Sequence, residues 1–146
     1  VIDTPAGLTR QELISATRGA DAILIPVMPS DIDIHAVMKC ISDLLLVAKI
    51  PRPDLKIGII ANRVRANTRV YGQLKKFLSS LDIPLVATLR DSQNYTRAFE
   101  FGMGIHEMPF SQVKKDIDAW SEIMGWLDRL RERNLGQPSA IHYLRG

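Results

Sequence analysis

Ala22-Ile23-Leu24-Ile25-Pro26-Val27 is a continuous apolar run, which is typical of a strand that protein covers on both faces. The turn and helix-capping sequence Pro29-Ser30-Asp31 follows it directly. Two more apolar runs come later in the chain, at Lys56-Ile57-Gly58-Ile59-Ile60-Ala61-Asn62 and at Pro84-Leu85-Val86-Ala87-Thr88-Leu89. Helical patterns separate these runs. Strands that alternate with helices predict an α/β fold built on a parallel sheet.

The predicted helices rest on capping signals and on apolar residues that recur every three or four positions. Thr9 and Glu12 have the spacing of a capping box, and Gly19 marks the end of that short helix. The other predicted helices run from Asp31 to about Ala48, before Pro51 and Pro53; from about Arg69 to Ser80; from Thr96 to a glycine stop at Gly102; and from near Ser111, with the stripe Val113, Ile117, Trp120, Met124, Leu127 and Leu130. We also expect a polar loop over Arg90 to Asn94 and a brief edge strand over Ile105 to Met108.

Composition limits the choice of protein class only broadly. The chain has 146 residues, 46% of them hydrophobic, which is enough for one core and indicates a single domain. The net charge of +3 permits an anionic partner without requiring one. No stretch reaches the roughly 20 apolar residues of a membrane span, so we expect no stable membrane insertion and a cytoplasmic location.

Cysteine and histidine offer no chemistry of their own. The single cysteine, Cys40, falls within an apolar helical pattern and is predicted to be a buried, unreactive thiol. His35, His106 and His142 lack metal-ligand spacing with one another or with Cys40.

The first residues, Val1-Ile2-Asp3-Thr4-Pro5-Ala6-Gly7, place an acid after apolar residues and before a Pro/Gly turn. A carboxylate at the end of a strand can hold Mg²⁺ through its water shell while phosphate oxygens complete the octahedron. A buried strand normally has more than two apolar residues, so we expect the chain to begin inside a strand. The alternative for Asp3 is an ordinary turn-forming residue.

Several motifs in order carry a resemblance to a known family. Asp3-Thr4-Pro5-Ala6-Gly7, Ala20-Asp21 before a strand, and Ile25-Pro26-Val27-Met28-Pro29-Ser30 follow the order and spacing of the deviant-Walker ATPases. The strand that ends in Asn62 and the later segment Arg97-Ala98 to Gly102-Met103-Gly104-Ile105 resemble the ParA branch of the ParA/MinD family. The resemblance extends over nearly the whole chain.

This resemblance implies a doubly wound, mostly parallel sheet of the P-loop NTPase type and a homodimer that binds ATP and Mg²⁺. It implies that Asp3 is the Walker B acid that organises Mg²⁺ through water, and that Pro5, Ala6 and Gly7 form the γ-phosphate switch. Asn62 would read the base, because an amide can donate and accept hydrogen bonds at an adenine edge. A capping or turn role is the alternative for Asn62. Arg90 and Asp91 would lie in a loop that closes over the base, or would be solvated loop charges.

The phosphate loop of such an ATPase is missing from this sequence, since none of the nine glycines precedes a lysine. We therefore interpret residues 1–135 as the C-terminal part of one P-loop ATPase domain and residues 136–146 as a C-terminal tail. The N-terminal half with the phosphate loop would be absent. Without the loop lysines and amides, this chain alone is predicted to have no ATPase activity.

The resemblance also implies partners and leaves two alternatives open. A ParA-like dimer binds DNA without sequence preference, associates with the nucleoid, moves plasmids, chromosomes or other cargo, and is stimulated by a ParB-like or cargo adaptor protein. Arg129, Arg131 and Arg133 are the candidate DNA contacts, with solvated surface charge as the default. The alternatives are a MinD-like ATPase that holds a membrane surface through its last helix, and a non-enzymatic adaptor half-domain.

Overall fold

The computed structural model describes residues 1–5, 7–46, 56–81 and 83–136. The predictions for Ala6, Ala48, Pro51 and Pro53, and for the tail after Gly136, concern residues outside these ranges. The observed elements, in chain order, are α1 (Arg10–Thr17), β1 (Ile23–Val27), α2 (Asp31–Leu46), β2 (Ile57–Val64), α3 (Arg69–Leu81), β3 (Leu85–Arg90), α4 (Gln93–Glu100), the 3₁₀ turn η2 (Ile105–Glu107) and α5 (Phe110–Gly136).

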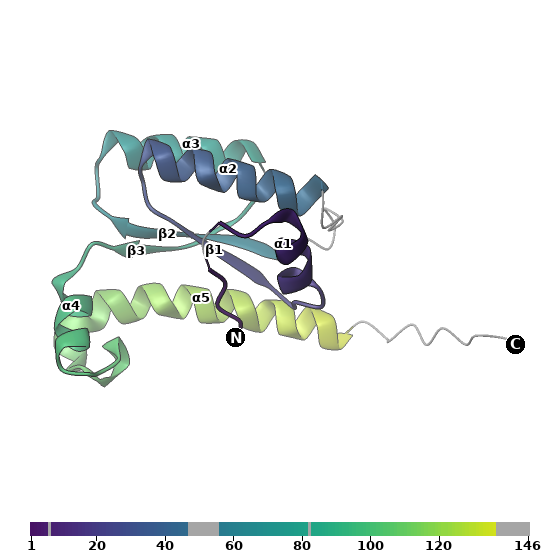
Figure 1. Ribbon diagram of the computed structural model, residues 1–146. Helices are drawn as coiled ribbons and strands as arrows, with labels where there is room; N and C mark the ends of the chain where they lie inside the picture. Colours follow the sequence, from purple (N-terminus) through teal and green to yellow (C-terminus); the bar gives the residue numbers. More distant parts are fainter. Residues whose placement is uncertain (6, 47–55, 82, 137–146) are drawn as a thin grey trace, which may run out of the picture.

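The three strands form a parallel sheet in the order β1-β2-β3. Helices α2 and α3 cover one face of this sheet, and α5 covers the other face (Figure 1). The predicted α/β class and the parallel sheet are therefore confirmed. The strand order follows the chain order, so the described strands do not include the reversal of direction that defines a doubly wound sheet.

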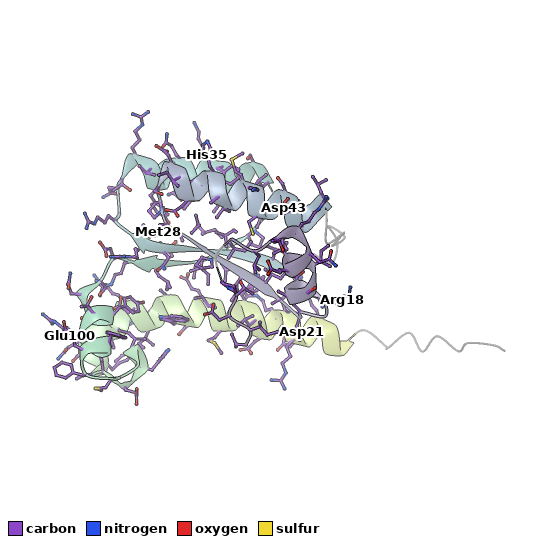
Figure 2. All side chains as sticks on the ribbon, in the orientation of Figure 1. Arg18, Asp21, Met28, His35, Asp43 and Glu100 are labelled. Atoms are coloured by element: carbon purple, nitrogen blue, oxygen red, sulfur yellow. The ribbon has the colours of Figure 1, made fainter. Side chains whose placement is uncertain are left out.

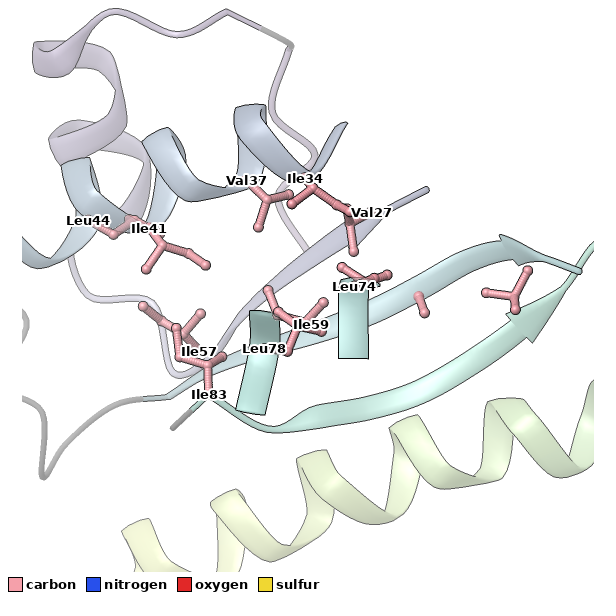
Figure 3. Packing of buried hydrophobic residues seen from close by; sticks show 12 residues of the cluster. Val27, Ile34, Val37, Ile41, Leu44, Ile57, Ile59, Leu74, Leu78 and Ile83 are labelled. Atoms are coloured by element: carbon pink, nitrogen blue, oxygen red, sulfur yellow. The ribbon is translucent and has the colours of Figure 1, made fainter. Parts of the chain in front are cut away.

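Apolar side chains fill the space on both sides of the sheet. Between the sheet and the pair α2 and α3 (Figure 3), the buried residues are Val27, Ile34, Val37, Ile41, Leu44, Ile57, Ile59, Ala61, Val64, Leu74, Leu78 and Ile83. On the α5 side, Ile60, Ala87, Leu89 and Ile123 are buried, with Trp120 and Leu127 packed against them. Because both faces of these strands are buried, their sequences are continuous apolar runs.

Two helix starts have the caps that the sequence predicts. The Thr9 hydroxyl accepts the Glu12 N–H, and the Glu12 carboxylate accepts the Thr9 N–H at 2.8 Å, so the capping box begins α1. The Ser30 hydroxyl accepts the Asp33 N–H at 3.1 Å at the start of α2. Gly19 follows α1 with φ +74°, a conformation that glycine adopts without strain.

Three local predictions are wrong. Residues 1–5 form no strand, and the side chains of Val1 and Ile2 are exposed. Two apolar residues can form too few ladder hydrogen bonds to offset the entropy lost on ordering them. Ile105 to Met108 is not an edge strand, because the Gly104 N–H binds the Glu107 carboxylate at 2.6 Å and the Glu107 N–H binds the Gly104 carbonyl at 3.0 Å, which closes the turn η2. Arg90 is the last residue of β3, and α4 begins at Gln93, which shortens the predicted polar loop.

The predicted helical stripes are correct in period and partly wrong in membership. Met38, which the three-four spacing of apolar residues in the helix after Asp31 predicts to be buried, and Met124 of α5 are exposed, with 44% and 55% of their surface accessible. Asp116 and Ile123 of α5 are buried instead. Positions 113, 116, 120, 123 and 127 keep the same three-four spacing as the predicted stripe, so periodicity alone did not decide between the two sets.

Candidate functional site

The carboxyl ends of the three strands lie at one edge of the sheet, because all three strands are parallel. Figure 2 labels Met28 just after the carboxyl end of β1 and Asp21 just before its amino end, at opposite ends of the sheet. Ligands of open α/β sheets bind outside the carboxyl ends of the strands. The side chains at this carboxyl edge therefore define the candidate site.

Asn62 and Asp91 are brought to this edge by neighbouring strands. Asn62 lies in β2, two residues before its end, and its side-chain oxygen accepts the Arg63 N–H at 3.0 Å. Arg63 has φ +51°, and the β2–β3 register is irregular between Ala61 and Val64. The Asn62 side chain thus makes a local hydrogen bond to the backbone in the irregular part of β2. Its amide group still lies at the predicted edge.

Asp91 joins the two strand ends. Its N–H donates to the Val64 carbonyl at 3.0 Å, and its carboxylate accepts a hydrogen bond from Arg65 Nε at 2.9 Å. Arg63 Nε lies 3.8 Å from the same carboxylate. The side chains of Arg63 and Arg65 are mostly exposed, so these ion pairs contribute little stability. Asp91 is therefore not a freely solvated loop charge, because it links the end of β3 to the end of β2.

Arg90 faces the side of the sheet that α5 covers, and it binds a buried acid on that helix. Its Nε and one terminal nitrogen donate to the two carboxylate oxygens of Asp116 at 2.7 and 2.8 Å. Asp116 has no exposed surface, whereas 45% of the Arg90 side chain is accessible. Asn94 Nδ2 adds a third hydrogen bond to Asp116 at 2.7 Å, and the Ser92 hydroxyl a longer one at 3.5 Å. A bidentate pair of this kind fixes both distance and orientation.

The electrostatics of this cluster favour the charged forms. The hydrogen bonds from Arg90 hold the pKa of Asp116 below its ordinary value of 3.8, and those from Asn94 and Ser92 act in the same direction, against the effect of burial. The same pair raises the pKa of Arg90. Burial raises the pKa of the neighbouring Tyr95 hydroxyl above its ordinary value of 10.0. Asp116 is therefore a carboxylate and Tyr95 is neutral at physiological pH.

Asp116 is a residue that sequence reasoning missed. Its signal was present in the chain, as an acid at a position three residues after Val113 and seven before Ile123 on the same helix face. A charged residue inside an apolar stripe indicates a partner elsewhere in the fold, because unpaired buried charge is costly. That partner, Arg90, is 26 residues away and could not be recognised from local spacing.

The predicted phosphate switch lies in an exposed segment. Asp3, Pro5 and Gly7 are exposed, and no hydrogen bond or ion pair among the described residues joins the Asp3 carboxylate to the Asn62–Asp91 edge. Gly7 has φ +75°, so a glycine suits the turn predicted at this position. Ala6 lies outside the described residues.

The three candidate DNA contacts are all exposed on α5. Arg129 and Arg133 are four residues apart and share a helix face, whereas Arg131 lies on the other side of the helix. One stretch of DNA backbone can therefore contact Arg129 and Arg133 together, but it cannot contact Arg131 at the same time. The predicted set of three separates into a pair and a single residue.

A shallow depression of about 520 Å³ lies beside the carboxyl edge, where β2 leads into α3. Asn67, Thr68, Arg69, Tyr71 and Lys75 line it. The Thr68 hydroxyl accepts the Tyr71 N–H at 3.4 Å, and the ammonium of Lys75 lies 4.8 Å from the centre of the Tyr71 ring. These groups are engaged with one another, so the depression adds polar surface to the edge and does not form an enclosed pocket.

Comparison with known proteins finds no family whose model matches this chain and no curated protein that matches it. In the part of the chain that the structure describes, no group of three or more His, Cys, Asp or Glu side chains is placed to hold a metal ion. Within residues 1–5, 7–46, 56–81 and 83–136, none of the helices combines the length and apolar character that crossing a bilayer requires.

Proposed function

We propose that the chain is the C-terminal part of a ParA-like ATPase that binds ATP with Mg²⁺, dimerises, and binds DNA without sequence preference to position cargo. In this proposal Asn62 reads the adenine edge, and the turn at Arg90 and Asp91 borders the base. Asp3 organises Mg²⁺ through water, and Pro5, Ala6 and Gly7 respond to the γ-phosphate. A cargo adaptor would stimulate hydrolysis.

The observation that carries the proposal is the meeting of Asn62 and Asp91 at the carboxyl edge of a parallel sheet. The Asp91 N–H donates at 3.0 Å to the carbonyl of Val64, which lies 27 positions earlier in the chain and two residues after Asn62. An edge of this kind is where α/β folds bind nucleotides. The side-chain amide supplies both a donor and an acceptor, which a purine edge requires.

The residues of this chain fit Mg²⁺ only together with a nucleotide. Asp3 is a single exposed carboxylate. Mg²⁺ in nucleotide sites is held by one or two carboxylates, several waters and the phosphates of the substrate. The ion would supply charge neutralisation at those phosphates. We therefore expect no Mg²⁺ binding by this chain in the absence of a nucleotide.

The direct test is binding of mant-ATP with Mg²⁺ to residues 1–146 and to the polypeptide extended upstream through the next in-frame segment. We expect only the extended form to bind and to hydrolyse ATP, because a triphosphate needs the phosphate loop. Asn62→Ala should weaken binding about tenfold, as expected for the loss of a hydrogen bond to a ligand.

Matched variants separate the nucleotide role of each residue from its structural role. Asn62→Asp keeps an oxygen that can accept the Arg63 N–H, and it loses the amide donor that a base would need. We expect it to weaken mant-ATP binding without loosening the irregular part of β2. Asp3→Ala should weaken binding, whereas Asp21→Ala, an exposed acid at the amino end of β1, should not. Failure of the extended form to bind mant-ATP would overturn the proposal.

A specific observation favours the adaptor as a second candidate. Phe99, Phe101 and Phe110 expose 85%, 74% and 60% of their surface around the end of α4 and the start of α5. Exposed aromatic side chains mark an interaction surface when they form one contiguous patch. If neither form of the protein binds mant-ATP, the adaptor becomes the leading function. The MinD-like alternative has no such support, because the Trp120 and Leu127 side chains of α5 pack on the sheet.

A further inference from the structure

The turn between β3 and α4 is held from two sides. Toward β2, the Asp91 N–H and carboxylate bind the Val64 carbonyl and the Arg65 side chain at 3.0 and 2.9 Å. Toward α5, the adjacent residue Arg90 makes its bidentate pair with Asp116. The side chains of Ser92 and Asn94 at the start of α4 bind the same carboxylate. One buried acid therefore receives hydrogen bonds from residues on both sides of Asp91.

Packing of α5 on the sheet does not require a charge at this position. The neighbouring buried residues of the helix face, Val113 and Ile123, are apolar, and the α5 side of the sheet is apolar as well. Replacing a buried ion pair by apolar residues is often neutral or stabilising in other proteins. An apolar side chain at position 116 could fill the same space. It could not accept hydrogen bonds from residues 90, 92 and 94, and these bonds fix the orientation of the turn.

We propose that Asp116 is a positioning residue, which acts through Arg90, Ser92 and Asn94 to set the turn that carries Asp91 at the carboxyl edge of the sheet. Its consequence for ligand binding rests on the proposed function, in which this turn borders the base. On that basis Asp116 is expected to affect nucleotide affinity although it lies on a different helix and is fully buried.

The experiment uses the polypeptide extended upstream, as wild type and as Asp116→Asn, Arg90→Gln, the double variant and Asp118→Asn. Asparagine has nearly the same shape as aspartate and keeps one acceptor, so the fold should survive. Asp118 is an exposed acid two residues away on α5 and pairs with Lys114 at 2.7 Å, which makes its variant the matched control. Amide hydrogen exchange by NMR and mant-ATP binding are measured for every variant.

We expect Asp116→Asn to weaken the side-chain hydrogen bonds that hold the turn and so to raise amide exchange about tenfold at Asp91 and Asn94, whose N–H groups donate to the Val64 carbonyl and the Ser92 hydroxyl. Exchange in β1, for example at Ile25, should stay unchanged, which a general loss of stability would not produce. The effects of Asp116→Asn and Arg90→Gln should not add in the double variant, because each removes the same pair. Mant-ATP affinity should fall about tenfold for Asp116→Asn and remain unchanged for Asp118→Asn.

Each outcome separates the two proposals. Unchanged exchange at Asp91 and Asn94, or an equal rise throughout the sheet, would overturn the positioning role whether or not the nucleotide binds. A local rise with no mant-ATP binding by the wild type would support the positioning role and overturn the proposed function. A local rise with nucleotide binding equal to that of the wild type would overturn the link between Asp116 and the ligand.

Discussion

Asp116 is the buried charged residue in the described part of the chain, and its removal should be costly. Asp116→Ala leaves Arg90, Ser92 and Asn94 without their shared acceptor. Arg90 is partly exposed and can regain water, so we expect a loss of about 2 to 3 kcal/mol and not the larger penalty of a fully buried partner. Urea unfolding measures this difference. Asp118→Ala, which removes an exposed helical pair, should cost less than about 0.5 kcal/mol.

The same residue predicts how stability depends on pH. The pKa of Asp116 is lowered in the folded state by Arg90, so the folded protein holds this proton less tightly than the unfolded chain does. The resulting stabilisation is fully present above the unfolded pKa of about 3.8 and is lost as pH falls through the folded pKa. Urea unfolding between pH 2 and 6 should therefore show a steeper acid decline for the wild type than for Asp116→Asn. Parallel curves would contradict this.

Cys40 gives a prediction about reactivity. Cys40 is partly buried, and not fully buried as the sequence predicts. Partial burial, and secondarily the charge of Asp43, raise the pKa of its thiol above the ordinary value of 9.0. The thiolate is the reactive form, so alkylation by iodoacetamide at pH 7.5 should be slower than that of a free thiol such as glutathione. Labelling should become fast in urea. Rapid labelling of the folded protein would show that the side chain is more accessible than its packing indicates.

At the scale of elements, Gly58 of β2 leaves space for two neighbours, Val86 of β3 and Trp126 of α5. A Cβ at Gly58 would clash with Cγ2 of Val86 and lie 3.0 Å from Cζ2 of Trp126. Gly58→Ala should therefore destabilise the protein by about 1 to 3 kcal/mol. Gly72→Ala is the control, because a Cβ there meets nothing within 4 Å on α3 and should stabilise the helix by about 0.5 to 1 kcal/mol. Equal effects of the two variants on urea unfolding would contradict the packing argument.

Local patterns predicted whether a segment is a helix or a strand, but they predicted less well which residues of a helix are buried. The Thr9 to Glu12 capping box and the apolar run at residues 22–27 placed α1 and β1 correctly, because both signals act within a few residues. The exposure of Met124 was not predictable, since Met124 and Ile123 both fit a helical stripe. Only the position of α5 against β2 and β3 decided which of them is buried.

At the scale of the whole molecule, the proposed DNA binding predicts a salt dependence. Arg129 and Arg133 share one face of α5, so replacing both by alanine should reduce the slope of log affinity against log salt by about 0.9 for each phosphate that the variant no longer neutralises. The extended polypeptide with ATP and duplex DNA of mixed sequence is the system to titrate. Arg18→Ala, an exposed arginine after α1, is the control. An unchanged slope for the double variant would exclude these two residues as phosphate-binding groups.

The α/β class, the parallel sheet and the positions of most helices and strands follow from local signals in the sequence. Caps, turns and apolar periodicity are short-range properties, and neighbouring residues are enough to specify them. The sequence predicted that the candidate site lies at the carboxyl edge of the sheet, because parallel strands end together, and that Asn62 lies at this edge. The Asp91 link to β2 and the Arg90–Asp116 pair emerged only from the tertiary structure. The first connects residues 27 positions apart and the second connects residues 26 positions apart, and only the packing of β2 and α5 beside β3 brings their atoms within hydrogen-bond distance.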